Sequence, residues 1–345
     1  MADTAAASGR YARQERYPGI GAAGQARLGA AVVTVVGCGA LGSASVNMLA
    51  RGGVGEIRII DRDVVELTNL QRQLLFEERD AEAGVPKAVA AAAAVARINS
   101  TIRAVPVVAD LTPYNVRELL AGSSVVIDGT DNLETRYLLN DACVQNGLPW
   151  VYGGVIGSTG MAMAIVPRRT ACFRCLFPRA PDATRLETCE TAGVLAAAVV
   201  TVASFQWMEA VKLIVGAESP TEGTLLTVDV WSGDYQVVHG IPRKLACACC
   251  VEGRYDYLDT RRVSHATVLC GRDVVQVSPG HPVRIDLPEF ARRFEGIGSP
   301  VVNEYLVRVV VDAHELTIFD DGRAIIRGTN DPVEARSLYA RWVGA

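Results

Sequence analysis

The sequence lacks three features that would place the protein with membrane, secreted or nucleic-acid-binding proteins. Its net charge is −4 and its pI is about 5.7, so general binding to nucleic acid or to an anionic membrane is not expected. Residues 1–16 contain no apolar stretch of the kind found in a secretory signal. The longest apolar run, residues 192–205, is too short to span a bilayer and continues into Gln206 and Glu209, so we expect a buried helix there. These absences favour a cytoplasmic protein.

Disulfides are not expected either, although the chain has nine cysteines, because the cytoplasm keeps thiols reduced. Four of the nine form two C-x-x-C pairs, Cys172 with Cys175 and Cys247 with Cys250. Two such pairs can supply four thiolates to a tetrahedral zinc ion. A redox pair and chance clustering are the alternatives. Cys249 lies inside the second pair, and only Cys247 with Cys250 keeps the two-residue spacing.

The order of apolar runs and glycines predicts an open, mostly parallel sheet. Residues 31–36 form a β-branched run typical of a strand buried on both faces, and "GCGALG" follows directly. A helical stretch then leads to a second strand, "GEIRIIDRD". This order is typical of Rossmann-like α/β folds. Further along, "GTLLTVDVWSGDYQVVHGI" predicts a hairpin, and hence an antiparallel extension.

The pattern changes after residue 255, which predicts a second, smaller domain. Two strands, "EYLVRVVV" and "HELTIF", are followed by a "DDG" hairpin turn and a last helix, "DPVEARSLYARWVG". A chain of 345 residues is long enough for one large domain and one small one. We therefore predict an α/β domain over residues 1–255 and an α+β domain over residues 256–345.

A glycine motif directly after the first strand predicts a nucleotide-binding turn. Gly37, Gly39 and Gly42 form G-x-G-x-x-G between a strand and a helix. Glycine at these positions lets backbone N–H groups approach a phosphate at the helix N-terminus. Asp61 ends the next strand, where a carboxylate can accept hydrogen bonds from ribose hydroxyls. ATP and a nicotinamide dinucleotide both suit this scaffold, so the motif alone does not distinguish them.

The residues that follow Asp61 do distinguish these nucleotides. Asn69, Arg72 and Gln73 lie in "TNLQRQ", a cluster of amides and a cation for which a dehydrogenase has no need. Arg72 can pair with phosphate oxygens through two N–H groups, and the amides can donate further hydrogen bonds. A solvated loop would explain any one of these residues. Together they predict a triphosphate site.

Two charged residues on later elements complete the predicted ATP site. Lys87, at the start of a helix, supplies a compact positive charge, and Asp131, after the fourth strand, supplies a carboxylate oxygen suited to Mg²⁺. Positive charge and a divalent ion allow a carboxylate to attack the α-phosphate of ATP although both are anions. A carboxylate is already ionised at neutral pH, so no general base is required. The chain has only four histidines and none in these motifs, which agrees with that chemistry.

These motifs occur in an order that resembles the ThiF/MoeB/HesA family, bacterial relatives of the ubiquitin-activating enzymes. The resemblance covers residues 10–252 and rests on "RYARQ" (10–14), "GCGALGS" (37–43), "DRDVVELTNLQRQLLF" (61–76), "PKA" (86–88) and "DGTDN" (128–132). Family members adenylate the C-terminal carboxylate of a small ubiquitin-like protein that typically ends in Gly-Gly. The resemblance implies Mg·ATP as cosubstrate, pyrophosphate as a product and a homodimer. It also implies a structural zinc ion at the two C-x-x-C pairs.

The same resemblance implies a role for individual residues. Asp61 would hold the ribose, and Asp131 would bind Mg²⁺. The residues that would hold and neutralise the phosphates are Asn69, Arg72 and Lys87. Arg13, in "RYARQ", would reach into the ATP site of the partner subunit.

Cys189 is a candidate for covalent chemistry. It precedes the long apolar helix, and a helix N-terminus lowers the pKa of a thiol. By resemblance it matches the cysteine that takes the activated carrier as a thioester or joins it in an acyl-disulfide. The following "GVLAAAVV" departs from the family's usual continuation, which contains Gly-Pro, and this leaves the role open. We expect the remaining single cysteines, Cys38, Cys143 and Cys270, to be packed in the protein.

The leading hypothesis is an adenylyltransferase that activates a sulfur-carrier protein, with a sulfur donor as a further partner. The alternatives are adenylation of a short peptide, as in microcin synthesis, an NAD-dependent oxidoreductase, and a non-catalytic dimeric scaffold. The presence of Arg72, Lys87 and Asp131 argues against the last two. Residues 256–345 would dock a carrier or a sulfur donor, or would stabilise a dimer.

Overall fold

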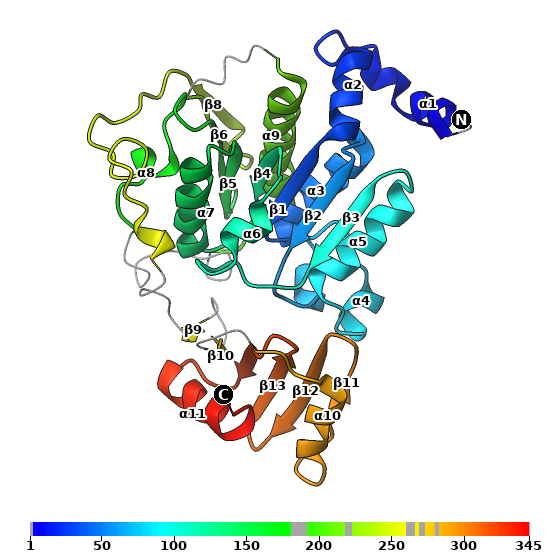
Figure 1. Cartoon of the computed structure of the whole chain (residues 1–345), viewed down its shortest axis with the longest axis vertical. Coiled ribbons are helices and arrows are strands. Elements are labelled where there is room, and N and C mark those ends of the chain that lie inside the picture. Colours follow the sequence, from blue (N-terminus) through cyan, green and yellow to red (C-terminus); the bar gives the residue numbers. More distant parts are fainter. Residues whose placement is uncertain are drawn as a thin grey trace. The chain divides into compact units, whose positions relative to one another are not determined.

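The chain forms two compact units, residues 1–261 and residues 262–345. A computed structural model, shown in Figure 1, describes residues 3–180, 192–217, 223–259, 266–268, 273–279 and 283–344. The first unit contains the glycine motif and both C-x-x-C pairs.

An eight-stranded sheet forms the centre of the first unit (Figure 1), with the strand order β3-β2-β1-β4-β5-β6-β7-β8. Neighbouring strands from β3 to β5 pair in parallel, and those from β5 to β8 pair antiparallel. The predicted Rossmann-like sheet with an antiparallel extension is therefore confirmed. The strands are β1 (Val32–Val36), β2 (Glu56–Ile60), β3 (Arg103–Val107), β4 (Val125–Asp128), β5 (Trp150–Ile156), β6 (Thr159–Ile165), β7 (Leu225–Asp229) and β8 (Asp234–Val238).

Helices cover both faces of the parallel part of this sheet, because its central strands are apolar on both sides. Val33 of β1 packs in one core cluster with Leu49 of α3 and Ala91 of α5. Val36 of the same strand packs in another cluster with Leu139 of α7. The described helices of this unit are α1 (Asp3–Glu15), α2 (Gly21–Ala30), α3 (Ala40–Gly52), α4 (Glu78–Glu82), α5 (Lys87–Ile98), α6 (Val116–Leu120), α7 (Leu133–Asn146), α8 (Phe173–Leu176) and α9 (Ala196–Val215), with short 3-10 helices η1 (Leu67–Asn69) and η3 (Asp256–Leu258).

The longest helix, α9, belongs to the core. Among the described helices it alone has the length and hydropathy that would allow it to cross a membrane, but half of its most apolar segment is buried inside the protein. It packs on α3, β5 and β6. Its buried Gln206 donates hydrogen bonds to the carbonyl oxygens of Asp128 (2.7 Å) and Val151 (3.2 Å), at β4 and β5. The expected buried helix is confirmed, and it begins at Ala196.

The described residues of the second unit form an antiparallel sheet with the helices α10 and α11, which agrees with the predicted α+β class. The strand order is β11-β12-β13-β14-β10-β9. Phe290 of α10 and Tyr339 of α11 pack against Leu316 and Ile326 of the sheet. The elements are β9 (Ala266–Val268), β10 (Val274–Val277), α10 (Leu287–Ala291), η5 (Arg292–Phe294), β11 (Val301–Val302), β12 (Leu306–Val311), β13 (His314–Phe319), β14 (Ala324–Arg327) and α11 (Pro332–Trp342).

Candidate nucleotide and metal sites

The glycine motif forms a tight turn between β1 and α3. Gly37 has a φ of +83°, a left-handed conformation that favours glycine, and its N–H donates to the carbonyl oxygen of Ile60 at 2.8 Å. A Cβ atom on Gly42 would lie 1.9 Å from the oxygen of Gly37, so only glycine allows α3 to pack this closely. A Cβ atom on Gly39 would meet only the Gln73 amide nitrogen, 3.9 Å away, which leaves space beside the start of α3.

Asp61 connects the glycine turn to the loop after β2. Its carboxylate is buried and accepts hydrogen bonds from the N–H groups of Cys38 (2.5 Å) and Asp63 (2.7 Å). Burial raises the pKa of Asp61 to about 6, and the nearby Lys87 opposes this rise. The carboxylate is therefore largely ionised at neutral pH and lies beside the turn, where a ribose ligand is predicted.

Lys87, the first residue of α5, and Asp131, in the loop after β4, lie within electrostatic range of each other. The side chain of Lys87 is 9% exposed, and its Nζ donates to Asp63 Oδ2 at 3.0 Å. Burial disfavours the ammonium ion, but Asp63 and Asp61 outweigh this effect and raise the pKa of Lys87 above its usual value. Asp131 is exposed and close enough to raise the pKa of both Lys87 and Arg62. This side of the glycine turn thus holds a fixed cation beside an accessible carboxylate.

The cluster of amides and arginine lies on η1 and the turn after it. Asn69 and Gln73 are buried, and Gln73 Oε1 has no hydrogen-bond partner among the described residues. A buried amide oxygen without a partner is costly, so Gln73 is suited to receive a hydrogen bond from a ligand or from water. Arg72 is partly exposed, and its guanidinium donates to the carbonyl oxygen of Thr68 at 3.0 Å.

Arg13 does not join this site within its own chain. It is exposed on α1, a helix held by Tyr11, whose hydroxyl accepts a hydrogen bond from Asn99 at 2.7 Å. Gln14 of the same helix donates to the carbonyl oxygen of Gly52 at 3.0 Å. Gly52 ends α3, and the glycine turn lies at the other end of that helix, about 20 Å away at 1.5 Å per residue.

Four cysteines from two distant segments form a compact cluster. The Sγ atoms of Cys172, Cys175, Cys247 and Cys250 lie within 4.8 Å of one another. Three of the Sγ–Sγ separations are 3.9, 3.6 and 3.5 Å, and four sulfurs at about 2.3 Å from a tetrahedral zinc ion would be about 3.8 Å apart. Hydrogen bonds among these thiols lower the pKa of Cys175 and raise the pKa of Cys172 and Cys250, as expected when neighbouring thiols stabilise one thiolate. The donor set and spacing fit a structural zinc ion.

The other cysteines have different surroundings. Cys38 and Cys143 are fully buried, as expected, and burial raises the pKa of both thiols. Cys189 and Cys270 lie outside the described residues.

Two residues of the nucleotide site were not predicted from the motifs. A Cβ atom on Gly129 would lie 2.3 Å from the oxygen of Gly37, so Gly129 allows the loop after β4 to reach the glycine turn. Asp63 holds Lys87 in place. Gly129 lies in the quoted motif "DGTDN", and Asp63 lies in "DRDVVELTNLQRQLLF". Their presence in these motifs could have identified both residues.

Arg136 was also not predicted, and it fixes the loop that leads to Asp131. Its guanidinium donates to Asp128 Oδ2 (3.1 Å) and to the carbonyl oxygen of Thr130 (2.6 Å). Asp128 also accepts hydrogen bonds from the backbone N–H and the hydroxyl of Thr130. No periodic pattern indicates this contact, because it depends on the bend between β4 and α7.

Comparison with known proteins identifies relatives along the whole chain. The pattern of the ThiF family matches residues 11–249. The "Sulfur carrier protein ThiS adenylyltransferase" of Bacillus subtilis (strain 168) is 40% identical over 339 residues, which are 98% of this chain and 100% of that protein. The "SAMP-activating enzyme E1" of Haloferax volcanii is 40% identical over 252 residues, 72% of this chain and 91% of that protein.

Solved structures show the same fold. The crystal structure of E. coli MccB with ATP superposes with a TM-score of 0.61 at 22% identity, covering 70% of this chain and 74% of that chain. At this level of identity the likeness concerns the fold alone.

Proposed function

The chain belongs to the ThiF family, and we propose that it transfers the adenylyl group of ATP to the C-terminal carboxylate of a small ubiquitin-like sulfur-carrier protein. The observation that carries the reaction type is the Lys87 ammonium ion held by Asp63, next to the buried Asp61 carboxylate that accepts the N–H of Cys38 in the glycine turn. The choice of a sulfur carrier is supported by the similarity, over nearly the whole chain, to the ThiS adenylyltransferase of Bacillus subtilis.

The nucleotide would lie across the glycine turn. Asp61 would accept hydrogen bonds from the ribose, and the N–H groups at the start of α3 would face the phosphates. Lys87 would exchange its partner Asp63 for a phosphate oxygen. Arg72 and the buried amides of η1 and the following turn would hold the rest of the triphosphate.

The reaction joins two anions. An oxygen of the carrier carboxylate attacks the α-phosphorus and forms the acyl-phosphate bond. The bond from the α-phosphorus to the bridging oxygen breaks, and its electron pair leaves with pyrophosphate. Lys87 and Arg72 stabilise the negative charge that builds up on the phosphate oxygens. Asp131 would hold Mg²⁺, and the bound ion would neutralise part of the charge of the triphosphate.

We propose that the active protein is a homodimer in which Arg13 serves the partner's site. The docking of α1 at the far end of α3 supports this, because it keeps Arg13 away from the phosphates of its own chain. The ending Gly-Gly on the carrier is likewise part of the proposal, since a narrow tail can enter a site that a folded domain cannot.

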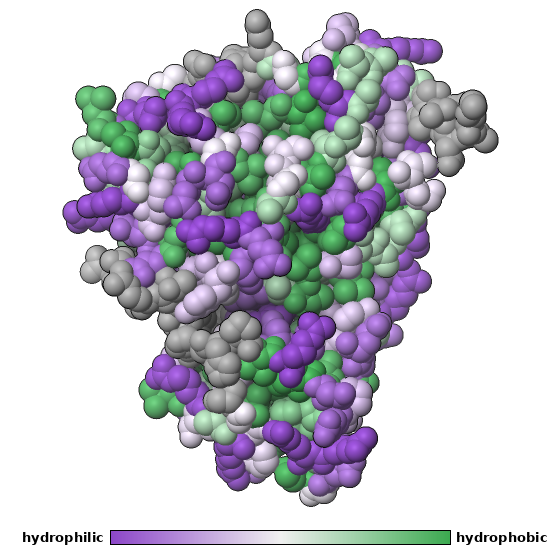
Figure 2. Space-filling view, in the orientation of Figure 1, coloured by the Kyte–Doolittle hydropathy of each residue, from purple (hydrophilic) through white to green (hydrophobic). Residues whose placement is uncertain are grey.

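A protein substrate needs accessible apolar surface, and the first unit offers it at the β7–β8 hairpin. Trp231, between the two strands, is 83% exposed, and Tyr235 of the edge strand β8 is 59% exposed. Figure 2 shows apolar residues interspersed with hydrophilic ones over the face in view. We propose this hairpin as a contact for the carrier.

The cysteine cluster and Cys189 would have separate roles. Four thiolates leave no open coordination position, so the zinc ion would stabilise the fold and take no part in the chemistry. Cys189 would take up the activated carrier, and its replacement by alanine should spare adenylation while removing any covalent adduct seen by mass spectrometry. A reducing cytoplasm would keep all of these thiols available.

The second unit would dock the carrier or a sulfur donor. The similarity to the Bacillus subtilis protein extends through this unit, which supports a role in sulfur-carrier activation. Removing residues 262–345 and measuring carrier-dependent pyrophosphate exchange tests the idea. An intact dimer with unchanged kinetics would reject it.

Adenylation of a short peptide and NAD-dependent oxidation gain no support from the arrangement of Lys87 and Asp131. The likeness to MccB shows a fold and does not favour a peptide substrate. A nicotinamide dinucleotide would have no use for a buried lysine beside an exposed carboxylate.

Exchange of labelled pyrophosphate into ATP tests the proposed function. The purified protein, with Mg²⁺ and a ubiquitin-like protein ending in Gly-Gly, should catalyse exchange. The same carrier without its last two glycines should support none. Exchange that proceeds equally with both carriers would contradict the proposed substrate.

A further inference from the structure

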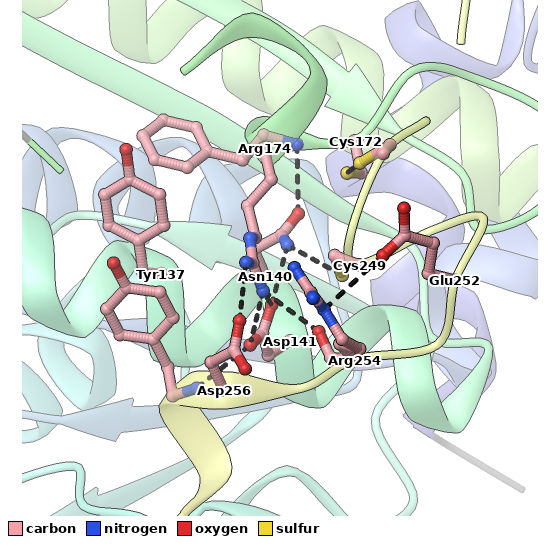
Figure 3. A network of polar contacts seen from close by, with 12 residues as sticks. Tyr137, Asn140, Asp141, Cys172, Arg174, Cys249, Glu252, Arg254 and Asp256 are labelled. Atoms are coloured by element: carbon pink, nitrogen blue, oxygen red, sulfur yellow. Dashed lines mark hydrogen bonds and ion pairs between the residues drawn. The ribbon is translucent and has the colours of Figure 1, made fainter. Parts of the chain in front are cut away.

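A fifth buried cysteine lies among the four that form the metal cluster. Cys249 is fully buried between Cys247 and Cys250, yet it is not a member of the four-sulfur group. Its Sγ accepts a hydrogen bond from the side-chain amide of Asn140 on α7 at 3.2 Å (Figure 3), and the thiol also interacts with Asp141 and with Cys172 of the cluster. Cys249 therefore joins the second cysteine segment to a helix of the nucleotide-binding fold.

The first cysteine segment is tied to the same helix. The side-chain oxygen of Asn140 accepts a hydrogen bond from the backbone N–H of Phe173, beside Cys172, at 2.9 Å. One amide thus holds both cysteine segments, one through each of its polar atoms. Asn140 is fully buried, so water does not compete for either bond.

The neighbouring Asp141 and Arg174 reinforce this connection. Asp141 is fully buried, and its carboxylate pairs with Arg174 at 3.3 Å and accepts the N–H of Tyr257 at 3.1 Å. Arg174, which lies between Cys172 and Cys175 in the sequence, also donates to the carbonyl oxygen of Arg254 (3.0 Å) and to Asp256 (2.8 Å). Figure 3 shows these contacts meeting at Arg174.

The other end of α7 belongs to the nucleotide site. The helix is capped by Asn132, whose side chain accepts the N–H of Thr135 and which directly follows Asp131. Arg136, in the first turns of α7, holds the loop after β4. Asn140 follows Arg136 by four residues, or about 6 Å along a rigid helix.

We propose that Asn140, Asp141, Arg174 and Cys249 form a polar latch through which metal occupancy of the cysteine cluster positions α7, and with it the loop that ends at Asp131. The proposal rests on the proposed function, because it assumes that Asp131 serves Mg·ATP. Metal binding fixes the two cysteine segments relative to each other, and the latch transmits that order to α7. These four are positioning residues, since none of them belongs to the four-sulfur group or to the predicted nucleotide-binding residues.

The variant Cys249→Ala tests the latch with little change in volume. It removes the acceptor for Asn140 together with the hydrogen bonds to Asp141 and Cys172, and it leaves all four metal ligands in place. Cys249→Ser keeps a group that can donate and accept hydrogen bonds. Cys143→Ala is the matched control, because Cys143 is a fully buried cysteine on α7 that belongs to neither the cluster nor the latch.

Two measurements test the proposed latch, and both start from the full-length protein loaded with zinc. The first is the rate at which zinc passes to a chelator. The second is the affinity for Mg·ATP before and after zinc removal. We expect Cys249→Ala to bind one zinc ion per chain and to release it about tenfold faster than the wild type. Cys249→Ser and Cys143→Ala should stay near the wild-type rate. Zinc removal should weaken Mg·ATP binding about tenfold in the wild type.

The proposal is overturned if Cys249→Ala releases zinc no faster than Cys143→Ala. It is also overturned if wild-type protein binds Mg·ATP equally well with and without zinc. Failure of the proposed function gives a different result, since wild-type protein would then bind no Mg·ATP even when it is loaded with zinc.

Discussion

Lys87 donates a hydrogen bond from Nζ to Asp63 Oδ2 over 3.0 Å. The lysine is nearly buried, whereas the side chain of Asp63 is 36% exposed. Acidic neighbours keep the pKa of Lys87 above its usual value, so the ammonium ion persists at any working pH. A partly exposed carboxylate is a partner that a phosphate can replace, and we propose that this contact holds Lys87 in place until ATP binds.

Replacing Lys87 by alanine should abolish most of the exchange activity without unfolding the protein. Loss of a positioned charge in the transition state typically costs about 10²–10³ in rate. The protein should lose some stability and still fold, because the exposed side of Asp63 can be hydrated while the buried Asp61 carboxylate loses a nearby cation. Lys212→Ala is the control, since Lys212 pairs with Glu209 on α9. Pyrophosphate exchange measures the activity, and thermal unfolding measures the stability. An equal loss of exchange activity in Lys87→Ala and Lys212→Ala would contradict the role of Lys87.

Replacing Asp131 by alanine should also abolish exchange. Asp131 is exposed and makes no hydrogen bond among the described contacts, so the melting temperature and the zinc content should not change. Glu118→Ala, an exposed acid on α6, should leave the activity intact. Near-normal exchange in Asp131→Ala at limiting Mg²⁺ would remove this residue from the metal site.

The pH dependence of ATP binding should report the Asp61 carboxyl. Burial raises its pKa to about 6, so the carboxyl becomes protonated below this pH and loses an acceptor for the ribose. Affinity for ATP should therefore fall as the pH drops through about 6. The stability contributed by Asp61 changes in the opposite direction. Because its pKa is raised in the folded state, that contribution is full below about pH 4 and is lost as the pH rises through 6.

Calorimetric titration of the wild type and Asp61→Asn across this range separates Asp61 from the phosphates of ATP, which titrate near the same pH. The ATP affinity of the wild type divided by that of Asp61→Asn should approach one at acid pH and should increase towards neutral pH. A ratio that does not change with pH would contradict the assignment.

Arg13 should complement in trans. A mixture of two inactive variants, Arg13→Ala and Lys87→Ala, should recover about a quarter of the wild-type activity after subunit exchange. This follows because half of the random dimers are mixed and each mixed dimer has one complete site. Mixing Arg72→Ala with Lys87→Ala gives no complete site and serves as the control. If the first mixture stayed inactive while dimers still exchanged, Arg13 would have no role in the partner's site.

Much of the fold could be predicted because the local signals agree with one another. The β-branched run at residues 31–36, the glycine turn and the helix after it all indicate the same strand–turn–helix unit. The hairpin of β7 and β8 follows from alternation and turn residues. The order of strands across the sheet could not be read from any local pattern. The structure supplies this order.

Less of the site could be predicted, because its geometry depends on contacts between loops. The pairing of Lys87 with Asp63 joins residues 24 positions apart in sequence, and the contact of Gly129 with Gly37 joins two separate strand ends. Asn140 also gave no signal, since a lone amide in a helix is normally exposed. Asn140 is buried because the two cysteine segments pack against α7, and the local sequence around Asn140 does not indicate that contact.

Calorimetric titration of the purified protein with ATP in the presence of Mg²⁺, set against titration with NAD, tests the central claim most directly. The Lys87 cation, together with the Mg²⁺ that we propose Asp131 binds, should select the triphosphate. We therefore expect one ATP bound per chain, at least about tenfold more tightly than NAD, a difference of about 1.4 kcal/mol. Failure to bind ATP, or tighter binding of NAD, would contradict the account and restore an oxidoreductase as the better explanation of this fold.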